Sequence, residues 1–159
     1  MSNHATADRC GDVRAQAPPR TRYIKTRTGF LMVLRHRDDV LARLAELAET
    51  EQLASASFVG MGFVHRATFG FYDFARKAYD PKTFYDTELA SMTGTIAWQN
   101  GKPSIHAHGV VCDASFAAAG GHVLELEVGT GSLEIMVTVH DQRLGREIDP
   151  DIQANILGL

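Results

Sequence analysis

Three histidines in the middle of the chain have the type and spacing of metal ligands. His106 and His108 lie two residues apart in the segment Ser104–Cys112, which has the pattern of a strand. Alternate residues of a strand point to the same face, so both imidazoles should project together. His122 follows the pair Gly120–Gly121, which lets neighbouring backbone come close. Three convergent imidazoles predict a site for a zinc-like divalent ion with one coordination position left open.

A second interpretation of the same residues is a hydrogen-bonded histidine cluster in the core or at a subunit boundary. Glu88 is the candidate catalytic residue, as a partner of a metal ligand or as a general acid–base. A metal-bound water and one carboxylate are the minimum for hydrolysis or decarboxylation. The alternative interpretation of Glu88 is a surface carboxylate at a strand end. The sequence therefore leaves open whether the protein is an enzyme, and its catalytic residues are otherwise unknown.

Composition limits the classes of protein that this chain can belong to. Its 159 residues are 45% hydrophobic and 22% charged, which predicts a folded domain, and its net charge is −3. Without a basic excess to neutralise phosphates, strong DNA binding by this chain alone is disfavoured. The two cysteines form no disulfide framework, and no apolar run approaches the roughly 18 residues that span a membrane. We expect a cytoplasmic protein with no membrane contact.

Hydrophobic patterning predicts one domain. Residues 1–21 lack apolar periodicity and are predicted to form a flexible N-terminal tail, so the domain should span residues 22–159. Val40, Leu44 and Leu47 recur with helical spacing, after Asp38 or Asp39 as the N-cap. Strands are predicted at 30–34, 57–64, 67–72, 104–112, 122–128 and 132–140, with one or two more within 84–98.

The links between these strands are short. Asn100-Gly101 is a strong hairpin signal, Gly129–Gly131 is predicted to be a turn, and Asp149-Pro150 is expected to open a short helix or turn. Few helical crossovers remain to build a parallel sheet. The predicted fold is therefore α+β: a mostly antiparallel sheet of about seven strands with one main helix on one face. Such a helix cannot easily cover both sheet faces, which leaves one for a partner subunit.

Several segments resemble the PPC domain family, named for "plants and prokaryotes conserved". They are Ala56–Gly62, Glu88–Ile96, Pro103–His108, Gly120–His122, Glu134–Val137 and Asp149–Leu159. Together they cover about residues 22 to 159 in the family's order. The pair of motifs His-x-His and Gly-Gly-His at this spacing is specific, whereas each motif alone would not be. One departure from the family pattern is the apolar link Asp113–Gly120, which bears on the placement of His122.

The resemblance implies a compact domain that assembles as a homotrimer, with an architecture similar to that of acetolactate decarboxylase. It also implies that His106, His108 and His122 hold a divalent metal, often taken as zinc. Plant members carry an AT-hook, an Arg-Gly-Arg-Pro motif that enters the DNA minor groove, and this chain has none.

Two functional hypotheses follow. The first is a trimeric domain whose metal site binds a small molecule or supports an unassigned reaction. The alternative is a DNA-binding or regulatory module, as the family is commonly labelled.

Overall fold

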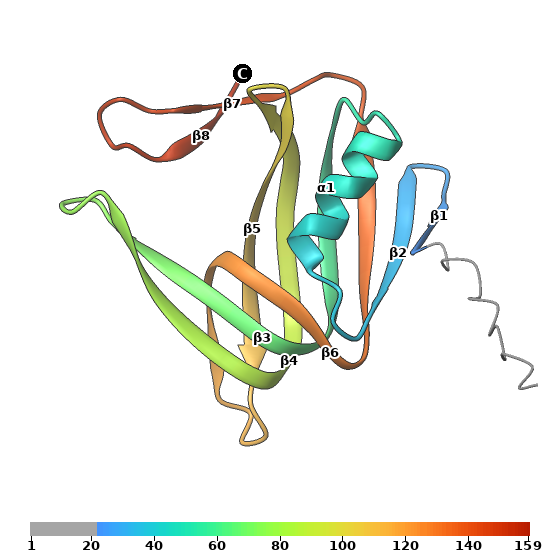
Figure 1. The fold of residues 1–159 in the computed structure, drawn as a ribbon, viewed down its shortest axis with the longest axis vertical. Coiled ribbons are helices and arrows are strands. Elements are labelled where there is room, and N and C mark those ends of the chain that lie inside the picture. The colour runs from blue at the N-terminus through green and yellow to red at the C-terminus, as the bar shows by residue number, and fades with distance from the viewer. Residues whose placement is uncertain (1–21) are drawn as a thin grey trace, which may run out of the picture.

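The computed structural model describes residues 22–159, and the predicted N-terminal tail at 1–21 lies outside them. One helix and eight strands make up this part of the chain (Figure 1). In chain order these are β1 Tyr23–Lys25, β2 Gly29–Arg35, α1 Val40–Thr50, β3 Ser55–Asp73, β4 Ala78–Gln99, β5 Lys102–Cys112, β6 Ala118–His140, β7 Gly145–Ile148 and β8 Asn155–Gly158.

The strands form one sheet in the order β1-β2-β6-β3-β4-β7-β8, and β5 pairs with both β4 and β6. The strands β3, β4, β5 and β6 therefore close into a ring in which each pairs with the next. Every pairing is antiparallel except the single contact between β4 and β7 at Trp98 and Gly145. The predicted α+β class, with a mostly antiparallel sheet and one helix, is confirmed.

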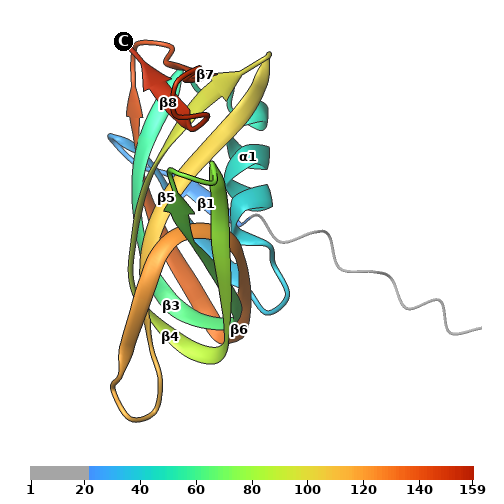
Figure 2. The ribbon, with the colours of Figure 1, turned by 90° about the vertical axis from the view of Figure 1, so that its left-hand side faces the viewer.

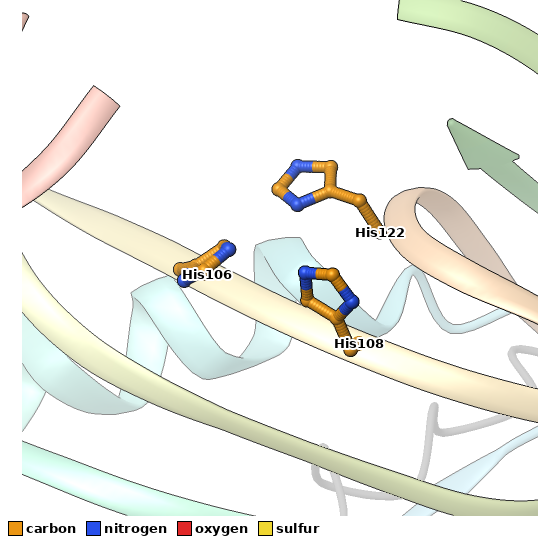
Figure 3. A group of neighbouring side chains, drawn as sticks. All are labelled: His106, His108 and His122. Atoms are coloured by element: carbon orange, nitrogen blue, oxygen red, sulfur yellow. The ribbon is translucent and has the colours of Figure 1, made fainter. Parts of the chain in front are cut away.

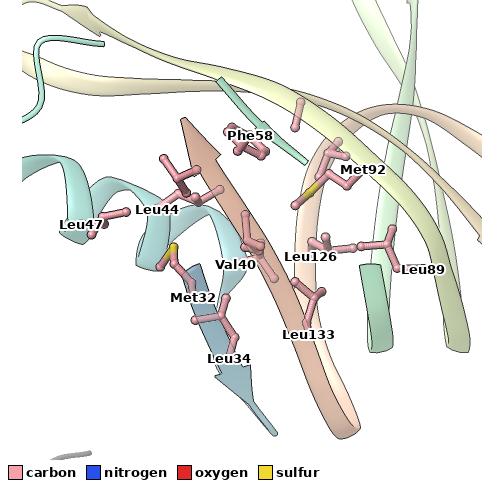
Figure 4. Packing of buried hydrophobic residues seen from close by; sticks show 14 of the residues in the cluster. Met32, Leu34, Val40, Leu44, Leu47, Phe58, Leu89, Met92, Leu126 and Leu133 are labelled. Atoms are coloured by element: carbon pink, nitrogen blue, oxygen red, sulfur yellow. The ribbon is translucent and has the colours of Figure 1, made fainter. Parts of the chain in front are cut away.

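Helix α1 lies on one side of the sheet, as Figure 2 shows. Asp39 is its N-cap, with the carboxylate accepting a hydrogen bond from the Ala42 N–H. Its buried face carries Val40, Leu44, Leu47 and Ala48, which is the stripe expected from the sequence. Figure 4 shows this stripe packed into the core with side chains from the sheet. At 11 residues α1 is too short to cross a membrane, and residues 22–159 hold no helix that could.

Two strand boundaries expected from the sequence are wrong. The predicted strands 57–64 and 67–72 are one strand, β3, and the predicted strands 122–128 and 132–140 are one strand, β6. The expected turn at 129–131 is a sharp bend within β6 (Figure 1), where its register against β3 shifts between Gly62 and Val64. A β-bulge of this kind bends a strand without ending its pairing. A Cβ at Gly129 would come within 2.9 Å of the backbone of β3, so glycine permits the bend.

The other two turns expected from the sequence, at Asn100-Gly101 and after Asp149, are confirmed. β4 and β5 meet at Asn100-Gly101, whose φ angles of 51° and 78° are those of a tight hairpin turn. Residues 150–152 form a turn, in which the Asp149 carboxylate accepts hydrogen bonds from the N–H groups of Asp151 and Ile152. This turn connects β7 to β8, a C-terminal hairpin that the sequence pattern did not predict.

Candidate metal centre

The three predicted ligands meet at one point of the surface. One ring nitrogen from each of His106, His108 and His122 lies within 4.8 Å of the other two. The ring centroids are 5.0–5.4 Å apart. Figure 3 shows the rings around a common space, with His106 and His108 on β5 and His122 reaching in from β6. The geometry fits one ion held by three imidazoles, the donor set of a metal site with an open fourth position.

The register of the sheet explains this convergence. His108 on β5 is the direct cross-strand partner of His122 on β6. Facing residues of an antiparallel pair have Cβ atoms about 4.5–5.5 Å apart, and His106 adds a third ring two residues along the same face. The intervening Ala107 is buried on the other side of β5. The alternation of the strand therefore sends the two imidazoles out of the core together.

A glycine allows β5 and β6 to come this close. Gly120 pairs with Val110, and a Cβ there would lie 2.2 Å from the Gly109 carbonyl oxygen. The link that precedes β6 folds into a tight turn. The Asp113 carboxylate holds this turn together by accepting hydrogen bonds from the N–H groups of Ser115 and Ala117. The apolar link at 113–120 therefore preserves the register that places His122 opposite His108.

Partial burial keeps His106 and His122 in the neutral form that binds metal. It is the main cause that lowers the pKa of His122 to about 4, and the charges of His106, His108 and Arg146 act in the same direction. Burial also lowers the pKa of His106, with Arg146 and His108 adding to the effect. A neutral imidazole has a free lone pair, so both residues are ready to bind a cation at neutral pH.

The histidines line a cavity of about 790 Å³ between two hairpins. The tip of the β3–β4 hairpin contributes aromatic side chains, and the β7–β8 hairpin contributes Arg146, Ile148 and Asn155. Both hairpins project to the left in Figure 1. The Tyr72 hydroxyl on the first donates to the Ile152 carbonyl oxygen beside the second, at 2.8 Å, which joins the hairpins across the cavity.

Two residues of this cavity were missed by the sequence reasoning. Tyr79 stacks on His122, and Arg146 lies almost fully buried in the wall. Tyr79 belongs to a hairpin tip rich in aromatic residues, which is a weak signal. No sequence pattern pointed to Arg146, since β7 lacks the hydrophobic alternation that would predict a strand.

Glu88, the candidate catalytic residue, does not line the histidine cavity. It is exposed on β4, directly opposite Cys112, and the two line a separate cavity of about 430 Å³ with Phe63 and Phe116. His106 and His108 face Thr95 and Thr93 on the same strand β4, five or more residues further along. The structure therefore does not bring Glu88 to the histidines. None of the described residues that line the histidine cavity is an aspartate or a glutamate.

Known structures share this fold. The "Putative DNA-binding protein" from Ralstonia eutropha JMP134 is 64% identical, with a TM-score of 0.84 over 87% of this chain and 96% of that one. The metal-containing protein from Archaeoglobus fulgidus is 25% identical, with a TM-score of 0.73 over 81% of this chain and 93% of that one.

Acetolactate decarboxylase from Bacillus subtilis strain 168 is 12% identical, with a TM-score of 0.54 over 77% of this chain and 57% of that one. This likeness concerns the fold alone and confirms the expected similarity of architecture. A comparison with curated proteins found no match.

The family model of the Plants and Prokaryotes Conserved (PCC) domain matches residues 22–141. This is the family that the sequence resembles, and the match covers most of the chain, including all three histidines. The chain therefore belongs to the Plants and Prokaryotes Conserved domain family.

Proposed function

We propose that this protein binds one divalent metal ion, zinc or a zinc-like ion, through His106, His108 and His122. The observation that carries the proposal is the convergence of three ring nitrogens within 4.8 Å. Imidazole accepts zinc and several other first-row metals, so the donor set alone does not select among them. The resemblance to a metal-containing protein of the same fold supports the assignment.

The proposed role of the site is to bind a small molecule at the open coordination position. The cavity beside the histidines is within the size range of small-molecule sites and is lined mainly by apolar and aromatic side chains. The lining residues include no carboxylate for general acid–base chemistry. These features favour ligand binding, or a reaction that needs only the metal and the bound molecule.

Metal analysis tests the proposal. The protein is purified without chelator at neutral pH, and its metal content is measured by mass spectrometry beside the double variant His106→Ala/His108→Ala. His65→Ala is the matched control, because His65 also lies on a strand but is hydrogen-bonded to Asp86 outside the cavity. We expect one ion per chain in wild type and in the control, and none in the double variant. A metal-free wild type that also fails to take up added Zn²⁺ or Co²⁺ would refute the proposal.

We also propose that the chain forms a homotrimer. Val59 and Met61 project from one face of β3, and Met136 on β6 lies directly opposite Val59. All three side chains are exposed, as is Phe63 just beyond them. A row of exposed apolar side chains on a sheet suits an interface with further copies of the chain. Light scattering after size exclusion should give three times the 17.4 kDa chain mass, whereas a monomer at micromolar concentration would contradict the assembly.

DNA binding is the second candidate function, because the 64% identical relative from Ralstonia eutropha carries a DNA-binding name. The net charge of −3 and the lack of an AT-hook argue against it. An electrophoretic shift assay at graded salt separates the two functions. DNA binding requires a shift at low salt whose affinity falls steeply as salt rises, whereas the metal-site proposal expects no shift.

A further inference from the structure

Arg146 on β7 is a buried cation without a counter-ion. Its side chain is only 8% exposed, and no carboxylate of residues 22–159 forms a salt bridge with it. One terminal nitrogen donates to the Thr95 hydroxyl at 2.7 Å, and the other makes a long contact of 3.4 Å to the Asn155 carbonyl oxygen. Nε is buried with no acceptor. A guanidinium held in this way is costly unless an anion completes its surroundings.

The guanidinium lies beside the candidate metal centre. Its hydrogen-bond partner Thr95 is the direct cross-strand neighbour of His106, so the two side chains share one face of the β4–β5 pair. Arg146 also lines the same cavity as the three histidines. A ligand in this cavity therefore meets Arg146 and the metal position together.

The charge of the cavity defines the ligand. Its lining contains three histidines and one arginine, and none of the described lining residues is acidic. With a divalent ion on the histidines, the formal charge of the site would be three positive charges, since arginine contributes one and neutral imidazole none. A ligand that balances this charge must be an anion. The planar fork of a guanidinium also matches the two oxygens of a carboxylate.

The remaining wall of the cavity is apolar. Phe71, Phe74 and Ile148 line it and are largely exposed, and Tyr79 covers the histidine side. A ligand with an apolar body would remove these side chains from water. A small inorganic anion would leave them exposed.

We propose that Arg146 is the anion-binding residue of this cavity and that its ligand is a small carboxylate with an apolar or aromatic body. The carboxylate pairs with Arg146, and an oxygen of the same molecule occupies the open metal position. This inference rests on the proposed metal site for its second contact only, since the pairing with Arg146 needs no metal.

Calorimetric titration tests the proposal with three probes. Mandelate carries a phenyl ring, a hydroxyl and a carboxylate, mandelamide is its uncharged counterpart, and inorganic phosphate is an oxyanion without an apolar body. Each is titrated into wild type, Arg146→Met and Arg146→Lys, in Zn²⁺-loaded and metal-free form. Arg143→Met is the matched control, because Arg143 lies three residues earlier and stacks on Trp98 outside the cavity.

We expect wild type to bind mandelate at least about tenfold more tightly than mandelamide or phosphate. Mandelamide lacks the charge-assisted pair with Arg146, and phosphate has no apolar body to cover the hydrophobic wall. Arg146→Met should lose that preference while retaining its zinc, and Arg143→Met should behave as wild type. Arg146→Lys keeps the positive charge but loses the planar guanidinium, so it should bind mandelate more weakly than wild type. This variant tests the proposal even if Arg146→Met does not fold.

Equal binding of mandelate by wild type and both Arg146 variants would overturn the assignment, as would equal affinity for mandelate and mandelamide. A preference for phosphate would replace the carboxylate class with a phosphate ligand and overturn it too. Zinc content reports separately on the metal site. If no zinc binds, the metal-free titrations still decide whether Arg146 holds a carboxylate.

Discussion

Tyr79 on β4 stacks on His122 on β6, with ring centroids 4.8 Å apart and ring planes 17° from parallel. The contact joins the tip of the β3–β4 hairpin to a candidate metal ligand. It holds the imidazole plane of His122 against rotation before any ion arrives. A metal-binding side chain that is already oriented loses less conformational freedom when the ion binds.

Removal of this stacking should weaken metal binding without abolishing it. We expect Tyr79→Ala to raise the Kd for Zn²⁺ by between about twofold and tenfold, because an aromatic pair contributes about 0.5–1.5 kcal/mol. Tyr79→Phe keeps the stacked ring and should bind as wild type. Tyr85→Ala removes an exposed tyrosine from the same strand and serves as the control. Competition titration with a chromophoric chelator measures all four proteins, and an unchanged Kd for Tyr79→Ala would contradict the role of the stack.

The pH dependence of stability follows from His122. Its pKa is about 4 in the folded protein and about 6.5 in an unfolded chain. Between these values the unfolded state binds more protons, so the free energy of unfolding of the metal-free protein should fall as pH drops from 6.5 to 4. The expected loss from this group is on the order of 1–2 kcal/mol, because solvent screens a partly exposed ring.

Chelator-treated protein should therefore show a Tm that declines across this pH window. His122→Asn removes the titrating group, and its Tm should decline less over the same range. Parallel declines in the two proteins would show that His122 does not cause the effect.

Gly120 should be intolerant of a side chain. A Cβ there would lie 2.2 Å from the Gly109 carbonyl oxygen and would force β5 and β6 apart. We expect Gly120→Ala to lower the free energy of unfolding by about 1–3 kcal/mol, as other overpacked sites do, and to weaken zinc binding because His122 moves away from His108. Gly109→Ala is the control in the same pair of strands, since its Cβ would meet other atoms no closer than 3.4 Å. Denaturant unfolding and zinc titration of both variants make the comparison.

Asp38 anchors the start of α1 with a buried carboxylate. It is 5% exposed, accepts the Arg35 N–H at 2.8 Å, and forms ion pairs with Arg22 and Arg43. Burial opposes its ionisation, but the Arg35 N–H and the two guanidinium groups outweigh burial and hold the pKa of Asp38 below its usual range. The stabilisation is therefore present at neutral pH and is lost as pH falls through this lowered pKa.

Asp38→Asn should lower the free energy of unfolding at pH 7 by about 2 kcal/mol, since charged hydrogen-bond partners are left incompletely paired. Asp39→Ala removes only the helix cap and should cost about 1 kcal/mol. Chemical denaturation at pH 7 and pH 3 compares them. The difference between Asp38→Asn and wild type should shrink at pH 3, and a constant difference would refute the ion-pair explanation.

Elements with strong local signals can be predicted from the amino-acid order alone. The spacing of Val40, Leu44 and Leu47 defined the helix, and Asn100-Gly101 defined the hairpin, because both depend on interactions between residues close in the chain. The His-x-His alternation likewise placed His106 and His108 on one face of β5. The family motifs then pointed to His122 as the third member of the site.

The way in which segments far apart in the chain meet could not be predicted from local patterns. The register between β5 and β6 places His122 opposite His108, and it depends on long-range pairing that no local pattern encodes. The bends that keep β3 and β6 continuous depend on bulges against neighbouring strands, so the glycines at 129–131 indicate a chain reversal where β6 only bends. Arg146 reaches the cavity because a C-terminal hairpin folds back beside β4, whereas Glu88, in a segment that matches the family pattern, faces a different cavity.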